Sequence, residues 1–264
     1  MNTAIMLWES CCIPSMLHGA GSWVEMSKAT EKKLNNLQCW FVRLILQTGP
    51  GTPLAALLWD FSLLDMGLRV WIEKIMLVFH LRSLDSDTLA NRVYIEHRNK
   101  GWPGLFKETS IICEQLNIED VNITRMNKIK YKSILIRACH IKNEERLRMQ
   151  ASDVKCERLK KEKYGKQEYS EDQDIVTTRN WFKTRFSLQP FGGNYSHDRR
   201  FSNSNWLCLC KATKEDESHL KSGHCEVYGD LNSQFGDLTE DRNLVAFFQA
   251  VLQRRDILEE NDRM

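Results

Sequence analysis

Three cysteines and one histidine near the carboxyl end constrain the fold of this chain more than any other feature. They are Cys208, Cys210, His219 and Cys225, with one, eight and five residues between successive members. The residues between them are mostly polar, so this stretch cannot build an apolar core of its own. Three thiolates and one imidazole suit a tetrahedral zinc ion, and a short segment that wraps a metal takes its folding free energy from that metal. The sequence therefore predicts a structural zinc module.

Two alternatives to this zinc site remain open from the sequence. Cys-x-Cys is a weaker metal signal than Cys-x-x-Cys, and cysteines that are merely packed together would show the same spacing. His224 is adjacent to Cys225 and competes with it as the fourth ligand, although Cys225 is preferred. Four protein ligands leave no open coordination position, so we do not expect a catalytic zinc.

The first 123 residues carry the periodicity of packed helices. Apolar residues repeat at helical spacing from Leu34 to Ile45 and again from Leu68 to Phe79. Thr30 is the expected N-cap of the first of these helices. The expected helices cover about 30–47, 67–84, 88–95 and 105–116. We therefore predict a mainly α fold that begins with a helical domain over 1–123.

The middle of the chain is basic. Residues 125–163 contain thirteen Lys or Arg and five Asp or Glu, a local charge of +8 in a chain whose formal net charge is +2. This stretch predicts a long helix or helix pair over about 124–164, with an apolar side formed by Ile129, Ile134, Leu135 and Ile136. Residues 165–180 are polar and predict a linker. Together they form an expected connector over 124–180.

Residues 181–264 form the predicted zinc module, which ends in a helix over about 240–260. Leu244, Phe247, Phe248 and Val251 repeat at helical spacing in this closing helix. Its first turn is acidic and its later part is basic, as the helix dipole favours.

Two groups of cations are candidates for contact with phosphates, because Lys and Arg side chains release counterions when they bind a polyanion. The basic middle segment contributes Lys128, Lys130, Lys132 and Arg137, and the region before the cysteines contributes Arg185, Arg199 and Arg200. The alternative is a solvated helix whose cations pair with Glu144 and Glu145. Trp181, Phe182 and Phe186 also resemble a base-stacking set, but the core of a small domain explains them better.

The sequence lacks the motifs that are typical of several classes of enzyme. There is no Gly-rich phosphate loop with its Lys, no G-x-S-x-G and no H-E-x-x-H. No adjacent aspartates are present to hold a pair of catalytic metal ions. No apolar run reaches the length of a membrane span, and the amino terminus lacks the basic region of a signal peptide. We expect a protein of a reducing, intracellular compartment, nuclear and/or cytoplasmic, that does not act on membranes.

Both ends of the chain resemble one family. The motifs are L-W-E-S-C-C-I-P-S-M-L-H-G-A-G-S-W (7–23) and G-P-G-T-P-L-A-A-L-L-W-D-F-S-L-L-D-M (49–66), then G-N-Y-S-H-D-R-R-F (193–201), W-L-C-L-C (206–210), E-D-E-S-H-L (215–220), G-H-C-E-V-Y-G-D-L (223–231) and F-F-Q-A-V-L-Q-R-R-D (247–256). In this order they resemble the region after the palm in reverse transcriptases of non-LTR (LINE-type) retrotransposons. Two departures are His18, where the family usually has Tyr, and the single residue between Cys208 and Cys210.

The resemblance implies a thumb-like helical domain and a Cys/His module that binds RNA or target DNA. The palm motif of that RNA-directed DNA polymerase is absent from this sequence. We therefore expect a nucleic-acid-binding fragment that is not an enzyme alone, and a partner could be the missing polymerase half in a longer polyprotein. The alternative is a domesticated or decayed element that acts as a zinc-stabilised protein-interaction module.

Overall fold

The structure is a computed structural model of the chain. It describes residues 2–23, 26–118, 127–150, 174–186, 188–189, 208–210, 217–238 and 240–261, together with 159, 164, 167 and 215. These residues form helices and turns, and no strand occurs among them. The predicted mainly α fold is confirmed. Within the described ranges, no helix combines the length and the apolar character needed to cross a membrane.

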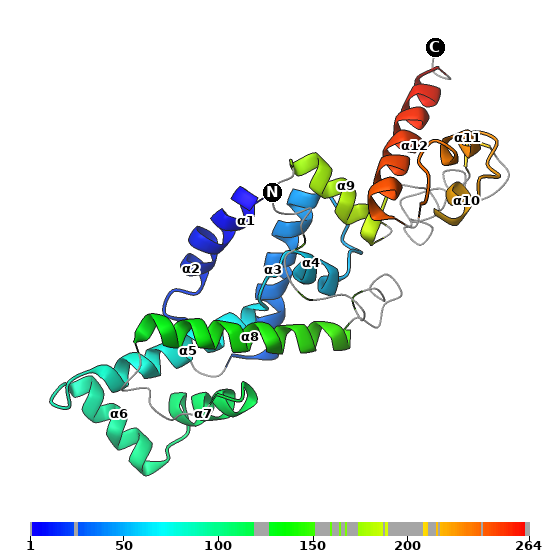
Figure 1. The fold of residues 1–264 in the computed structure, drawn as a ribbon. Coiled ribbons are helices and arrows are strands. Elements are labelled where there is room, and N and C mark those ends of the chain that lie inside the picture. Colours follow the sequence, from blue (N-terminus) through cyan, green and yellow to red (C-terminus); the bar gives the residue numbers. More distant parts are fainter. Residues whose placement is uncertain are drawn as a thin grey trace. The chain divides into compact units, whose positions relative to one another are not determined.

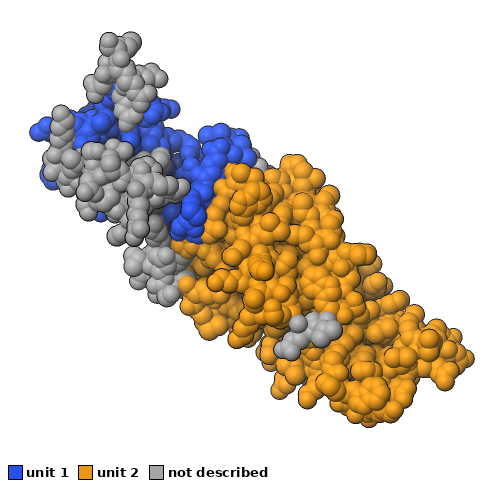
Figure 2. Space-filling model, turned by 180° about the vertical axis from the view of Figure 1, so that it is seen from behind, with its two compact units in different colours: residues 1, 46–52, 168–264 blue, residues 2–45, 53–167 orange. Residues whose placement is uncertain are grey.

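The chain divides into two compact units (Figure 2). The amino-terminal unit contains residues 2–45 and 53–167, and the carboxyl-terminal unit contains residues 1, 46–52 and 168–264. The boundaries predicted from the sequence are near 123 and 180. In the structure, the basic helix of the predicted connector is part of the amino-terminal unit.

The amino-terminal unit consists of helices (Figure 1). They are α1 (Asn2–Leu7), a π turn (Trp8–Cys12), α2 (Ile13–Met16), a 3-10 turn (Ala20–Ser22), α3 (Lys28–Leu46), α4 (Leu54–Asp60), α5 (Met66–Ser83), α6 (Leu89–Lys100), α7 (Leu105–Gln115) and α8 (Lys128–Gln150). The helices predicted over the first 123 residues are all present. The prediction that Thr30 is the N-cap of α3 is wrong. Ser27 caps this helix, because its Oγ accepts a hydrogen bond from the backbone N–H of Thr30 at 3.1 Å.

The core of this unit is built on α5. Leu68, Ile75 and Phe79 of α5 are buried against α7 and α8, and the ring of Phe79 stacks on that of Tyr131 with centroids 5.0 Å apart. The predicted apolar side of α8 is partly wrong, because Ile129 is 80% exposed and Ile134 is 41% exposed. The buried face of α8 instead repeats every four residues and consists of Tyr131, Leu135, Cys139, Asn143 and Leu147.

A buried polar clamp, formed by Asn35, Gln38 and Asn143, holds the start of α5. Asn35 Oδ1 accepts from the N–H of Met66 at 2.9 Å, and Gln38 Nε2 donates to the carbonyl of Leu64 at 3.0 Å. Asn143 Nδ2 donates to the carbonyl of Leu63 at 2.9 Å. These side chains satisfy backbone groups that would otherwise be buried without partners. The clamp therefore joins α3 and α8 to the chain segment from which α5 starts.

Gly21 lets the 3-10 turn approach α5 closely. A Cβ added at Gly21 would lie 2.8 Å from the carbonyl oxygen of Glu73, closer than real contacts allow. We expect Gly21→Ala to lower the free energy of unfolding by about 1–3 kcal/mol, because backbone must shift to admit the methyl group. Chemical denaturation measures this change. Gly51→Ala is the matched control, since nothing lies within 4 Å of its added Cβ. Equal stability of the two variants would contradict the close approach.

The carboxyl-terminal unit contains α9 (Ile175–Arg185), α10 (Glu217–Lys221), α11 (Gly229–Asn232) and α12 (Asp241–Asn261). The predicted closing helix is confirmed as α12. The predicted linker over 165–180 is wrong in its last part, because α9 begins at Ile175. Asp174 caps this helix by accepting hydrogen bonds from the N–H groups of Val176 and Thr177. Phe182 and Phe186 are fully buried, as expected for core residues.

Candidate metal centre

The structure brings together the four residues that the sequence singled out. One ligand atom each from Cys208, Cys210, His219 and Cys225 lies within 4.8 Å of all the others, and this group could hold a metal ion. The Sγ atoms of Cys208 and Cys225 are 3.5 Å apart, and Cys210 Sγ is 3.3 Å from Nε2 of His219. These three cysteines are free thiols and form no disulfide bond. The arrangement therefore places two close ligand pairs around one point.

Cys225 is the fourth member of the cluster. Its side chain is buried, whereas the adjacent His224 is exposed and is not part of the group. Cys208 is buried too, while Cys210 and His219 are partly exposed. Burial raises the pKa of the Cys208 thiol well above its usual range. A metal ion bound there must therefore displace protons, since the thiolate is the ligand.

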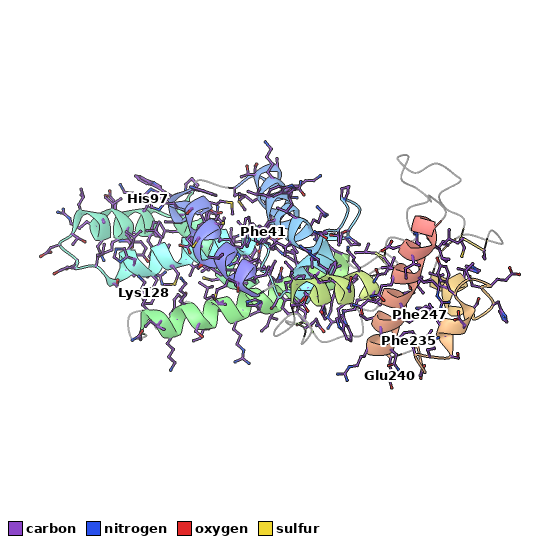
Figure 3. The ribbon with its side chains drawn as sticks, turned by 90° about the horizontal axis from the view of Figure 1, so that it is seen from above. Phe41, His97, Lys128, Phe235, Glu240 and Phe247 are labelled. Atoms are coloured by element: carbon purple, nitrogen blue, oxygen red, sulfur yellow. The ribbon has the colours of Figure 1, made fainter. Side chains whose placement is uncertain are left out.

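An apolar core supports the two buried cysteines. Cys208 and Cys225 pack in one cluster with Tyr228 and with the buried face of α12, which includes Phe247 and Phe248. Figure 3 labels Phe247 and Phe235 in this unit, and their ring centroids are 6.2 Å apart. The cluster explains the apolar repeat of α12, because one face of this helix carries the segment that presents the ligands.

The loop between His219 and Cys225 is held by close backbone contacts. Gly223 has a φ of +70°, a conformation that suits glycine after a helix end. A Cβ on Gly229 would lie 2.6 Å from the carbonyl oxygen of Gly223. Asn232 Nδ2 donates to the carbonyl of Lys221 at 3.2 Å, at the end of α10. Gly229 at the start of α11 and Asn232 at its end therefore hold Gly223 and the end of α10 close to α11.

Two arginines of α12 attach the ligand segments to that helix. Arg255 pairs with Glu215, whose side chain is 2% exposed, at 2.8 Å. Arg254 pairs with Asp230 and donates to the carbonyl of Val227 at 3.0 Å. Removing Arg255 would leave a buried carboxylate without its charge partner, which is costly. Sequence reasoning missed Glu215, because an acidic run such as 215–217 is usual for an exposed surface.

The candidate phosphate contacts lie in different environments. Lys128, Lys130, Lys132 and Arg137 are exposed on α8, and Figure 3 labels Lys128 at the start of that helix. Arg185 is only 8% exposed, and its guanidinium lies 5.7 Å from the ring centre of Phe186. A buried guanidinium cannot meet phosphate, so Arg185 is removed from the candidates. Arg199 and Arg200 lie outside the described residues.

Comparisons of the chain with protein-family models, with curated proteins and with solved structures give no match.

Proposed function

We propose that the chain binds nucleic acid through the α8 cations, defined as Lys128, Lys130, Lys132 and Arg137 in the first half of α8. The observation that carries this proposal is that these four side chains are exposed and have no acidic partner among the described residues. Because no acidic side chain pairs with them, these cations are available to neutralise phosphates.

The charges along α8 separate the two readings of the basic segment. Residues 128–140 include four cations and no Asp or Glu. The second half of the helix is different, because Lys142 pairs with Glu145 and Arg148 pairs with Glu144. The solvated, salt-bridged reading therefore suits the second half, and the phosphate-binding reading suits the first.

The proposed metal is zinc in a structural role. Tetrahedral zinc has Zn–S bonds of about 2.3 Å and Zn–N bonds of about 2.0–2.1 Å, so its ligand atoms lie roughly 3.5–3.8 Å apart. The two closest ligand pairs, at 3.5 and 3.3 Å, are near these edges. Three thiolates with one imidazole favour zinc over the hard cations, which prefer oxygen. Four protein ligands leave no position for substrate, so the ion would support folding.

The resemblance to reverse transcriptases of LINE-type retrotransposons supports a proposal of the same kind. In that reading, the amino-terminal unit corresponds to the thumb-like domain and the carboxyl-terminal unit to the Cys/His module. Both parts serve nucleic-acid binding rather than chemistry. We propose that the chain alone carries out no polymerisation and that RNA or DNA is its partner.

The salt dependence of binding tests the role of the α8 cations. Four contacts to a single strand predict a slope of about −3 for log affinity against log salt, or about a 50-fold loss between 50 and 200 mM salt. We expect replacement of all four cations by glutamine to remove most of this slope. Fluorescence anisotropy with a labelled single-stranded oligonucleotide measures it.

The control replaces Lys100 and Lys107, two exposed lysines outside α8, by glutamine. This variant should keep the slope and most of the affinity. Wild-type affinity that stays constant across that salt range would refute nucleic-acid binding of this kind. Equal slopes in the α8 variant and the control would show that phosphates bind elsewhere.

A further inference from the structure

The amino-terminal unit contains a pocket of about 620 Å³ between α2, α5 and α8. Its apolar lining comes from all three elements and includes Ile13, Leu17, Ile72 and Ile136. Its polar lining includes Arg69 and Glu73 of α5. A volume of this size, lined by both apolar and polar side chains, is typical of a site for a small molecule.

One donor in this pocket has no partner. The Nε atom of Arg69 is buried and forms no hydrogen bond with any described residue, although the same guanidinium donates through Nη2 to Glu9 at 2.7 Å. Buried donors without partners are rare in native structures, and an unfilled binding site is one explanation. The guanidinium of Arg69 therefore lines the pocket with donor capacity that Glu9 does not fully use.

One acceptor lies a helical turn further along α5. Glu73 is partly buried and lines the pocket, and its carboxylate forms neither an ion pair nor a hydrogen bond with any residue that the structure describes. Because Arg69 and Glu73 are four residues apart, they lie on the same side of the helix. The pocket thus offers a donor and a charged acceptor side by side between apolar walls.

The face of α8 that lines the pocket also carries two of the proposed phosphate contacts, Lys128 and Lys132. Lys132, Ile136 and His140 line the pocket at spacings of four residues, and Lys128 is one turn before them. His140 contributes no positive charge at neutral pH, because burial, and then the nearby Arg69, lowers the pKa of its imidazole. Lys132 therefore places a positive charge at the α8 end of the pocket.

We propose that this pocket holds one unpaired guanine of a nucleic-acid strand whose phosphates lie on Lys128 and Lys132. The inference rests on the proposed function, which it makes more specific. Guanine offers O6 and N7 as acceptors to an arginine, and its N1–H and N2–H groups can donate to a carboxylate. Arg69 and Glu73 supply these two complements. Adenine lacks the N1–H donor, and the pyrimidines are smaller and offer fewer edge groups.

Single-stranded oligothymidines that differ at one central position test the proposal without altering the protein. We expect the strand with a central guanine to bind about tenfold more tightly than all-thymidine, since a bidentate base contact discriminates by about that factor or more. Inosine, which lacks the N2 amine, should lose much of the gain. Anisotropy at one fixed salt concentration measures these affinities, with guanosine monophosphate as a competitor.

The variant Glu73→Gln should reduce the preference for guanine over inosine, because a neutral amide accepts a weaker hydrogen bond from the N2 amine than a carboxylate does. Glu114→Gln, at an exposed position of α7, is the control and should keep the preference. Equal affinity for all strands, with the steep salt dependence retained, would overturn the guanine pocket but not phosphate binding by the α8 cations. Absence of any salt-dependent binding would overturn both. Guanosine monophosphate that binds as tightly as the guanine strand would overturn the role of the strand.

Discussion

Replacing Cys225 by serine should remove the metal from the chain and unfold the segment that contains α10 and α11. Structural zinc in small modules contributes about 10–16 kcal/mol of folding free energy, so the loss of one thiolate has a large effect. The segment is also tied to its core by this residue, because Cys225 is buried with Cys208 and Tyr228. Metal content by mass spectrometry and proteolysis of the folded chain measure the two consequences. We expect one zinc per chain in the wild type, none in the variant, and new cleavage sites between Cys208 and Asn232.

Two controls isolate the site. Cys12→Ser removes an exposed thiol outside the cluster and should keep the zinc. His224→Ala should also keep it, since this exposed histidine is not a member of the group. A chelator should reproduce the proteolysis pattern of Cys225→Ser in the wild-type chain. If Cys225→Ser retained zinc and His224→Ala lost it, His224 and not Cys225 would be the fourth ligand.

Periodicity predicts helices well in this chain, but it predicts their buried faces only where apolar residues make the contacts. In α5 the expected residues Leu68, Ile72 and Ile75 are all buried. In α3, by contrast, Leu37 is 42% exposed and Leu44 is 60% exposed. The helix presents Asn35 and Gln38 to the interior instead, because these amides bind backbone groups before and within α5. A hydrophobicity pattern gives no weight to buried amides, so it selects the wrong side.

The two candidate sites differ in how far the sequence can define them. The metal cluster is local, since its four residues span 18 positions, and unusual residue types mark it. The pocket is assembled from α2, α5 and α8, and its polar residues Arg69 and Glu73 are ordinary at the level of sequence. Their spacing of four resembles any surface pair on a helix. Only the packing of three elements shows that both lie in one cavity.

The ion pair between Lys74 and Glu108 should be the most sensitive polar contact of the amino-terminal unit. The side chain of Lys74 is fully buried in α5, and its Nζ is 2.5 Å from Oε1 of Glu108 on α7. Glu108→Gln removes the countercharge and leaves the ammonium group inside the protein. Breaking a buried pair in this way costs about 3–5 kcal/mol, because the remaining charge keeps its desolvation penalty. We expect a fall of roughly 10 °C in the melting temperature of this unit.

A second substitution separates the charge from the packing. Lys74→Met fills a similar volume without charge, so the double variant with Glu108→Gln should recover most of the lost stability. The control is Glu96→Gln, which breaks the exposed pair of Glu96 with Lys100 on α6 and should change stability little. Thermal melting followed by circular dichroism measures all four proteins. If Glu108→Gln had the same melting temperature as the wild type, the ammonium group of Lys74 would have to reach another partner or water. The position of α7 on α5 would then not depend on this ion pair.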